Sequence, residues 1–241
     1  MMNMLTSKRT KGRIWSFRLL LSVLASVLMV VNLYLIFVWA PTATEEHQFN
    51  LQRVFYFHIP LAWVSFLAFF VVLVGSIFYL WKKSIKWDAI AYAAAEIGVV
   101  CTTLVLTTGS IWARGIWEIW WTWEPRLTTT LILWFIYLAY LMIRGYAPTP
   151  VLKARYSSVI GIVGFIDVPI VYFAASWWRG LHPQPVVGPT SEPGSLDPSM
   201  YMVLMFSMVT LTVLFALLLR ERVSMRITEA DIRDVKYYIG R

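Results

Sequence analysis

The sequence has 241 residues, of which 59% are hydrophobic and 14% charged, with a mean hydropathy of +0.65. Charged residues make up about a quarter of an ordinary soluble domain. The low share here therefore excludes a soluble domain and predicts an all-α membrane protein. The net charge of +8 would suit a nucleic-acid partner, but basic residues in membrane proteins usually mark the cytoplasmic loops. We therefore expect membrane lipid, and no nucleic acid, around this chain.

Four apolar stretches are long enough to cross a hydrocarbon core of about 30 Å at ~1.5 Å per residue, and two more are long enough if one polar residue is allowed in each. The first follows a basic start, as a secretory signal does. It runs from Leu19 to Ala40, which is longer than the ~7–15 apolar residues of a signal core, so we expect a retained helix. No soluble domain fits between the stretches, and residues 1–241 are expected to form a single integral-membrane domain. The predicted spans are 19–40, 59–81, 89–111, 127–144, 156–177 and 200–219.

The basic residues divide unevenly between the two sides of these spans. Seventeen of the 21 Lys and Arg residues lie on the side of the two termini, and four lie on the other side. The positive-inside rule then predicts that the basic N-terminus (1–18) and the C-terminal tail (220–241) lie on the cytoplasmic side of an inner membrane. All three histidines, His47, His58 and His182, fall on the outer face, as a single outer metal or haem site requires.

The second outer loop, residues 112–126, is unusually rich in tryptophan. An aromatic belt at the headgroup level accounts for one or two such residues. Five of the chain's 13 Trp residues in one short loop favour a platform for a flat aromatic ligand such as a porphyrin. If the segment is helical, Trp117, Trp120 and Trp121 share one face. The five residues are Trp112, Trp117, Trp120, Trp121 and Trp123.

Charged residues accompany this loop. Pro125 suits the first turn of a helix, and Glu124 before it complements the positive end of the helix dipole. Arginine binds carboxylates, such as the two propionates of haem, through paired N–H donors. Glu118 and Glu124 would repel those propionates unless an arginine pairs with them. The arginines available on the outer face for this role are Arg114, Arg126 and Arg179.

Two of the histidines lie among aromatic residues at predicted helix ends. His58 lies at the outer end of the second span, just before Pro60, and His182 follows the fifth span. Either one alone is typical of an interfacial residue bonded to a carbonyl or to water. Together, two imidazoles on opposite faces of one porphyrin would form a six-coordinate, low-spin iron centre. His47 lies in a polar loop and is expected to be a solvated bystander.

Two acids and one cysteine lie inside the predicted spans. No Lys, Arg or His within the membrane is available to pair with Glu96 or Asp167. We expect both acids to be neutral and hydrogen-bonded to Ser, Thr or Tyr of adjacent helices, with a proton or substrate path as the alternative. Cys101 stands alone, which excludes a disulfide framework, a thiolate zinc site and a CxxC pair and predicts an apolar packing residue.

The sequence resembles the haem-handling membrane proteins of cytochrome c biogenesis, which are marked by a tryptophan-rich outer loop. The length favours a small member, since larger relatives add further helices. The usual loop reads Trp-Gly-x-x-Trp-x-Trp-Asp, whereas this chain has Glu118 for the glycine, Ile119 where threonine is common and Glu124 for the aspartate. The resemblance rests on Phe55 to Trp63, Trp117 to Tyr137 and Val168 to His182, within about Phe49 to Arg220.

The resemblance implies that His58 and His182 are the axial ligands of a haem b. It implies delivery of that haem to a periplasmic haem chaperone, which the tryptophan loop contacts, and it implies an ABC transporter pair and a small single-helix subunit as further partners. No enzyme is expected, because nothing in the sequence resembles a nucleophile with its base, a phosphate-binding glycine loop or a hydrolytic metal site. The residues expected at the haem are His58, His182, Trp117, Trp120, Trp121, Trp123, Glu124, Arg126, Arg114 and Arg179.

Two other functional classes remain open. A b-type haem electron carrier normally needs two stacked haems and four histidines divided between the two faces, whereas this chain has three on one predicted face. A transporter or channel subunit would use Glu96 and Asp167, but it leaves the tryptophan loop unexplained.

Overall fold

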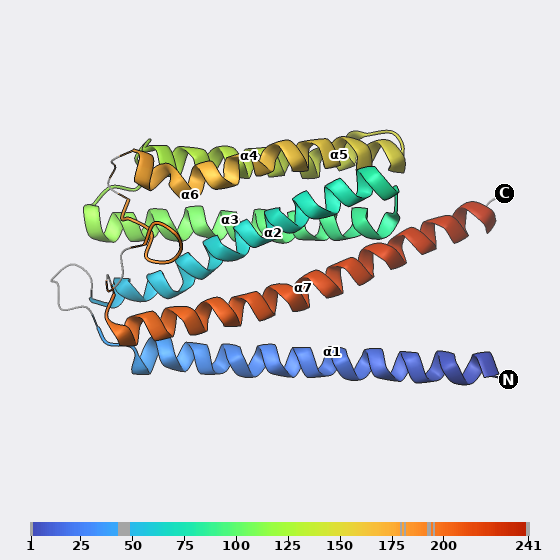
Figure 1. The fold of residues 1–241 in the computed structure, drawn as a ribbon, viewed down its shortest axis with the longest axis horizontal. Helices are drawn as coiled ribbons and strands as arrows, with labels where there is room; N and C mark the ends of the chain where they lie inside the picture. The colour runs from blue at the N-terminus through green and yellow to red at the C-terminus, as the bar shows by residue number, and fades with distance from the viewer. Residues whose placement is uncertain are drawn as a thin grey trace.

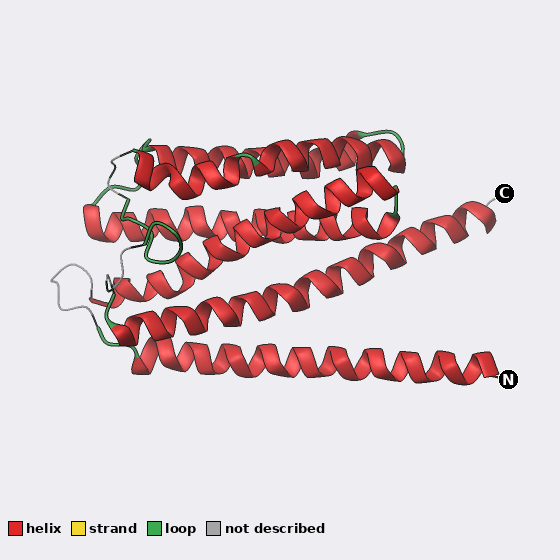
Figure 2. Ribbon diagram, in the orientation of Figure 1, coloured by secondary structure: helices red, strands yellow, loops and turns green. Residues whose placement is uncertain are grey.

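A computed structural model describes residues 2–42, 49–178, 180, 182–191, 194 and 196–239, without the side chains of 2–17, 49, 234, 237 and 238. Helices and loops make up all of this part of the chain, and it contains no strand (Figure 2). Six helical stretches are long and apolar enough to cross a membrane, which confirms the predicted all-α, six-span fold. The elements, labelled in Figure 1, are α1 (Met2–Tyr34), a π-helical turn η1 (Leu35–Trp39), a 3-10 turn η2 (Phe49–Val54), α2 (Phe55–Lys82), α3 (Ile85–Trp117), α4 (Pro125–Tyr146), α5 (Pro150–Phe165), α6 (Asp167–Trp177) and α7 (Pro198–Ile239).

The helices form a bundle around α2 and α3. α7 packs against α1, α2 and α3, while α4, α5 and α6 pack together on the other side of the bundle (Figure 1). The core between these groups is aromatic and tight, with the rings of Phe69 and Tyr137 stacked at 3.7 Å. The free ends of α1 and α7 lie at one end of the bundle, here called the terminal end. Residues 118–124, together with the described residues between α6 and α7, lie at the opposite end, here called the loop end (Figure 1).

Helix boundaries differ from the predicted spans in several places, and α1 and α5 begin earlier than predicted, at Met2 and Pro150. The fifth span is broken at Ile166, because Pro169 has no N–H and its ring would clash with the carbonyl of Phe165 in a continuous helix. α3 and α7 also continue past their predicted ends, to Trp117 and Ile239. Residues 112–117, predicted to begin the second loop, and residues 220–239 of the predicted C-terminal tail are therefore helical.

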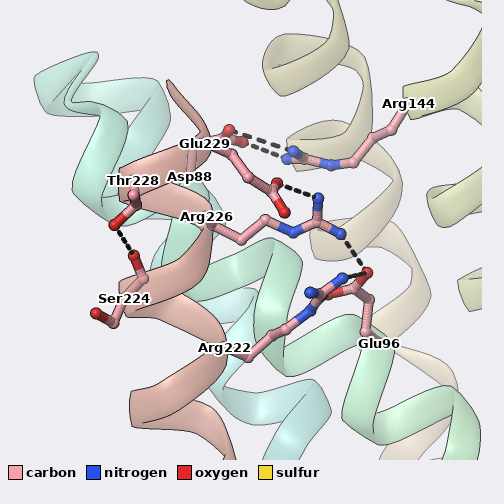
Figure 3. Close-up of polar contacts among 8 residues, drawn as sticks. All are labelled: Asp88, Glu96, Arg144, Arg222, Ser224, Arg226, Thr228 and Glu229. Atoms are coloured by element: carbon pink, nitrogen blue, oxygen red, sulfur yellow. Dashed lines mark hydrogen bonds and ion pairs between the residues drawn. The ribbon is translucent and has the colours of Figure 1, made fainter. Parts of the chain in front are cut away.

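Glu96 is ion-paired, and the prediction that no basic residue is available to it is wrong. Arg222 donates to its carboxylate from Nε at 2.7 Å and from Nη2 at 2.8 Å, and Arg226 binds the same group. Figure 3 shows both guanidinium groups reaching from α7 to Glu96 on α3. The prediction failed because α7 continues beyond its apolar part, and two arginines four residues apart share the face that packs on α3.

The ion pairs around Glu96 belong to a larger charged cluster at the terminal end. Asp88, Tyr92 and Glu96 are spaced four residues apart on one face of α3. Arg144 of α4 binds Asp88, with one N–O distance of 3.2 Å (Figure 3). The Arg144 guanidinium also lies 4.3 Å from the Tyr92 ring centre. Arg226 lies 3.8 Å from the same ring. The cluster thus links α3, α4 and α7.

The other two residues singled out inside the spans have different outcomes. The Oδ2 atom of Asp167, in the first turn of α6, is buried and accepts no hydrogen bond from the described residues, so the predicted bond is not found at this oxygen. Cys101 is 8% exposed and packs with Val64, Ala68 and Phe215, which confirms the apolar packing role predicted for it.

Candidate functional site

A cavity of ≈ 340 Å³ lies at the loop end, within the size range of small-molecule sites. Residues of α2, α3, α4 and α6 surround it, and Met208 of α7 contributes one side chain. Residues from the non-helical segments 119–124 and 182–189 complete the wall. Its lining is mostly apolar, with His58, His182, Glu124 and Arg126 among the polar side chains. The aromatic walls are formed by Phe55, Trp63, Phe66, Trp112, Trp117, Trp121 and Tyr172.

His58 is held by α2 and by a hydrogen bond to α3. Its Nδ1 atom lies 2.9 Å from Oγ1 of Thr108. The Thr108 hydroxyl has one proton, which it donates to the carbonyl of Leu104 at 2.7 Å, so it accepts a hydrogen bond from His58 Nδ1–H. The proton of the neutral ring is thereby assigned to Nδ1. The Nε2 lone pair stays free to bind a metal.

Two further residues of α3 fix the position of the His58 ring. A Cβ atom on Gly109 would lie 3.0 Å from Cε1 of His58, so the glycine permits the close approach of the two helices. The Trp112 indole meets the ring edge-on, with centroids 5.9 Å apart. Thr108 and Gly109 were not predicted as site residues. Because they lie about 50 positions from His58 in the chain, no local pattern identifies them.

His182 lies outside the helices and is held by backbone and carboxylate contacts. Its Nδ1 atom lies 2.9 Å from the carbonyl oxygen of Pro183, which can only accept, so Nδ1 again bears the proton and Nε2 is free. Its backbone N–H donates to Oε2 of Glu124 at 3.1 Å. Burial, the nearby Arg126 cation and a contribution from His58 lower the pKa of His182 from 6.5 to about 3. The ring is therefore neutral at physiological pH, the form that binds iron.

The predicted arginines have different surroundings. Arg126, the second residue of α4, lines the cavity, and its Nη1 atom is buried without a hydrogen-bond partner among the described residues. A buried cationic donor without an acceptor is costly and marks a place for an anionic ligand group. Arg114 is exposed, donates to the backbone carbonyl of Glu118 and does not line the cavity. Arg179, like His47, lies outside the described residues.

The tryptophan-rich segment does not form the helical face considered above. α3 ends at Trp117, and Glu118 has a left-handed backbone with φ of 59°, so residues 118–124 are not helical. Trp120 and Trp123 are 60% and 74% exposed and do not line the cavity. The predicted residues that do line it are Trp117, Trp121, Glu124, Arg126, His58 and His182, and Trp112 joins them.

Replacing Glu118 with glycine is expected to stabilise the protein. A left-handed residue after the last turn of a helix favours glycine, because other L-residues cost about 1–2 kcal/mol in that conformation. We expect E118G to raise the free energy of unfolding by about 1 kcal/mol, measured by thermal or denaturant unfolding in detergent. Glu118→Ala retains the strain and is the control. An E118G protein no more stable than E118A would contradict the prediction.

Comparisons with known proteins converge on one family. The family model described as heme exporter protein C (CcmC) matches residues 4–237. Heme exporter protein C of Bradyrhizobium diazoefficiens is 34% identical over 194 residues, which cover 80% of this chain and 72% of that protein. The Escherichia coli K12 protein of the same name is 30% identical over 82% of this chain and 78% of its own length. A putative cytochrome c biosynthesis ccmC-like mitochondrial protein of Marchantia polymorpha is 32% identical over 60% of each chain.

Proposed function

Because the chain belongs to the heme exporter protein C (CcmC) family, a non-catalytic component of cytochrome c maturation, we propose that it holds haem b between His58 and His182 and presents it to a periplasmic haem chaperone. Membership of this family confirms the resemblance found in the sequence, and the six apolar helices agree with a multi-pass membrane protein. Haem is the cargo here, and any covalent chemistry on it belongs to the partner.

The proposal depends above all on the pairing of the two histidines. His58 and His182 come from distant parts of the chain and line one cavity. Each donates its Nδ1–H to a protein oxygen, so each keeps a free Nε2 lone pair for iron. Hydrogen bonds of this kind orient a metal-binding imidazole and raise its basicity. An iron porphyrin accepts two such ligands on its axial positions.

The remaining lining also fits a porphyrin. Indole and phenyl rings supply flat apolar surface for the macrocycle. The buried Nη1 atom of Arg126 lacks an acceptor among the described residues, and a propionate carboxylate would satisfy it. The excess of basic residues on the side of the termini supports a periplasmic location for the cavity.

Partners are proposed from the same arrangement and from the family. Trp120 and Trp123 offer large exposed indoles next to the cavity, where a haem chaperone would contact the protein. Apolar surface on the helices is available for membrane lipid, for a small single-helix subunit and for ABC transporter subunits. The transporter alternative is less well supported, because Glu96 is neutralised by Arg222 and Arg226 in a structural cluster.

Binding of a modified porphyrin tests the role proposed for Arg126. Wild-type protein in detergent is expected to bind iron protoporphyrin IX about 10- to 100-fold more tightly than its dimethyl ester, since the ester removes the charge that Arg126 would pair with. Arg126→Gln should abolish most of this difference, measured by absorption titration. Arg114→Gln, at an exposed arginine outside the cavity, is the control and should preserve it. Equal affinity of wild type for both porphyrins would contradict the assignment.

A further inference from the structure

The two histidines of the cavity are held by different kinds of structure. His58 belongs to α2 and is bonded to Thr108 of α3, so two packed helices fix it. His182 belongs to a non-helical segment, and among the described residues its ring forms a hydrogen bond only with the neighbouring Pro183. The position of His182 therefore depends more on contacts with other parts of the chain than the position of His58 does.

Glu124 provides such a contact. It is the last residue before α4 and ends the tryptophan segment, defined here as residues 118–124. Its Oε2 atom accepts the backbone N–H of His182 at 3.1 Å. Among the hydrogen bonds of the described residues, this one alone connects the tryptophan segment to residues 180 and 182–191. Because the acceptor is a carboxylate, the bond is stronger than one between neutral groups.

Gly180 makes room for this hydrogen bond. A Cβ atom at this position would lie 2.4 Å from Oε2 and 3.4 Å from the carboxyl carbon of Glu124. Any larger residue there would push the carboxylate away from the His182 amide. The contact between the two segments therefore needs an accepting side-chain oxygen at position 124 and no side chain at position 180.

We propose that Glu124 is a positioning residue that couples the tryptophan segment to His182, so that displacing this segment withdraws His182 from the iron while His58 stays bound. The proposal rests on the proposed function and deepens it by assigning which ligand is released at transfer and what releases it. A protein that docks on Trp120 and Trp123 would act on the segment that contains Glu124. His182 keeps its Nδ1 proton throughout and leaves as a neutral imidazole.

The hydrogen bond itself is tested in haem-free protein. Hydrogen–deuterium exchange, read by mass spectrometry on peptides that contain the His182 amide, should be about 10- to 100-fold faster in Glu124→Ala and in Gly180→Ala than in wild type. Glu118→Gln removes the same charge from the same segment without a contact to His182, and it should exchange like wild type. Unchanged exchange in E124A would overturn the proposal.

The coupling to the iron ligand is tested in haem-loaded protein. Carbon monoxide binds reduced six-coordinate haem only after one histidine leaves the iron. We expect E124A and G180A to raise the rate of carbon monoxide binding about 10-fold or more. Glu124→Gln, which keeps an accepting oxygen, should recover at least part of the wild-type rate. Adding G180A to E124A should not increase the rate of carbon monoxide binding further, because both substitutions remove the same contact. A wild-type rate in E124A would overturn the coupling.

The same measurements separate this proposal from the proposed function. If His58→Ala and His182→Ala both retain the wild-type haem spectrum, the ligand assignment fails, and the coupling to iron fails with it whatever the exchange data show. If those variants lose the spectrum but E124A exchanges amide and binds carbon monoxide like wild type, the proposed function stands and the role of Glu124 is refuted.

Discussion

Replacing either His58 or His182 with alanine is expected to convert the haem of the detergent-purified protein from a low-spin to a high-spin species, or to remove it. Each variant loses one of the two free Nε2 atoms of the cavity, and a five-coordinate iron with one imidazole is high-spin. Absorption spectra of the oxidised and reduced protein measure the change. Exogenous imidazole should restore the low-spin spectrum in either variant, since it fits the space of the missing ring.

His47→Ala is the control for these variants, because His47 was predicted to be a solvated bystander. Its spectrum should equal that of wild type. The ligand assignment would be wrong if both His58→Ala and His182→Ala kept an unchanged low-spin spectrum. It would also be wrong if His47→Ala alone lost that spectrum.

Replacing Glu96 with alanine is expected to lower the free energy of unfolding by about 2–3 kcal/mol. The change leaves two partly buried guanidinium groups, those of Arg222 and Arg226, without their shared acceptor. Removing one partner of a buried ion pair costs about 3–5 kcal/mol, and the partial exposure of these side chains reduces that cost. Unfolding in mixed micelles with a denaturing detergent measures the difference.

Glu229→Ala is the matched control for Glu96→Ala. Glu229 also binds Arg226, at 2.9 Å, but its side chain is 53% exposed, so we expect a loss of less than about 0.5 kcal/mol. Neither residue lines the cavity, and the haem spectrum of both variants should match that of wild type. Equal stability of E96A and E229A would show that the cluster does not fasten α7 to α3.

Hydropathy predicted the spans well because each helix must bury about 30 Å of apolar length whatever its neighbours are. It predicted helix ends less well. Hydropathy marks the end of the apolar stretch, but a helix can continue beyond that point, as α7 does to Ile239. The same limitation hid the partners of Glu96, since Arg222 and Arg226 appeared to belong to a separate tail.

Local sequence patterns were enough to predict the six spans, the clustering of tryptophan beside Pro125 and the two histidines next to aromatic residues. These features follow from local composition and from the resemblance that local motifs carry. None of these patterns reveals that His58 and His182 line one cavity or that Thr108 and Pro183 leave both Nε2 atoms free. The contact of Glu124 with the His182 amide is likewise visible only in the folded protein. Such contacts join residues far apart in the chain, and helix packing, which one-dimensional patterns do not encode, sets their geometry.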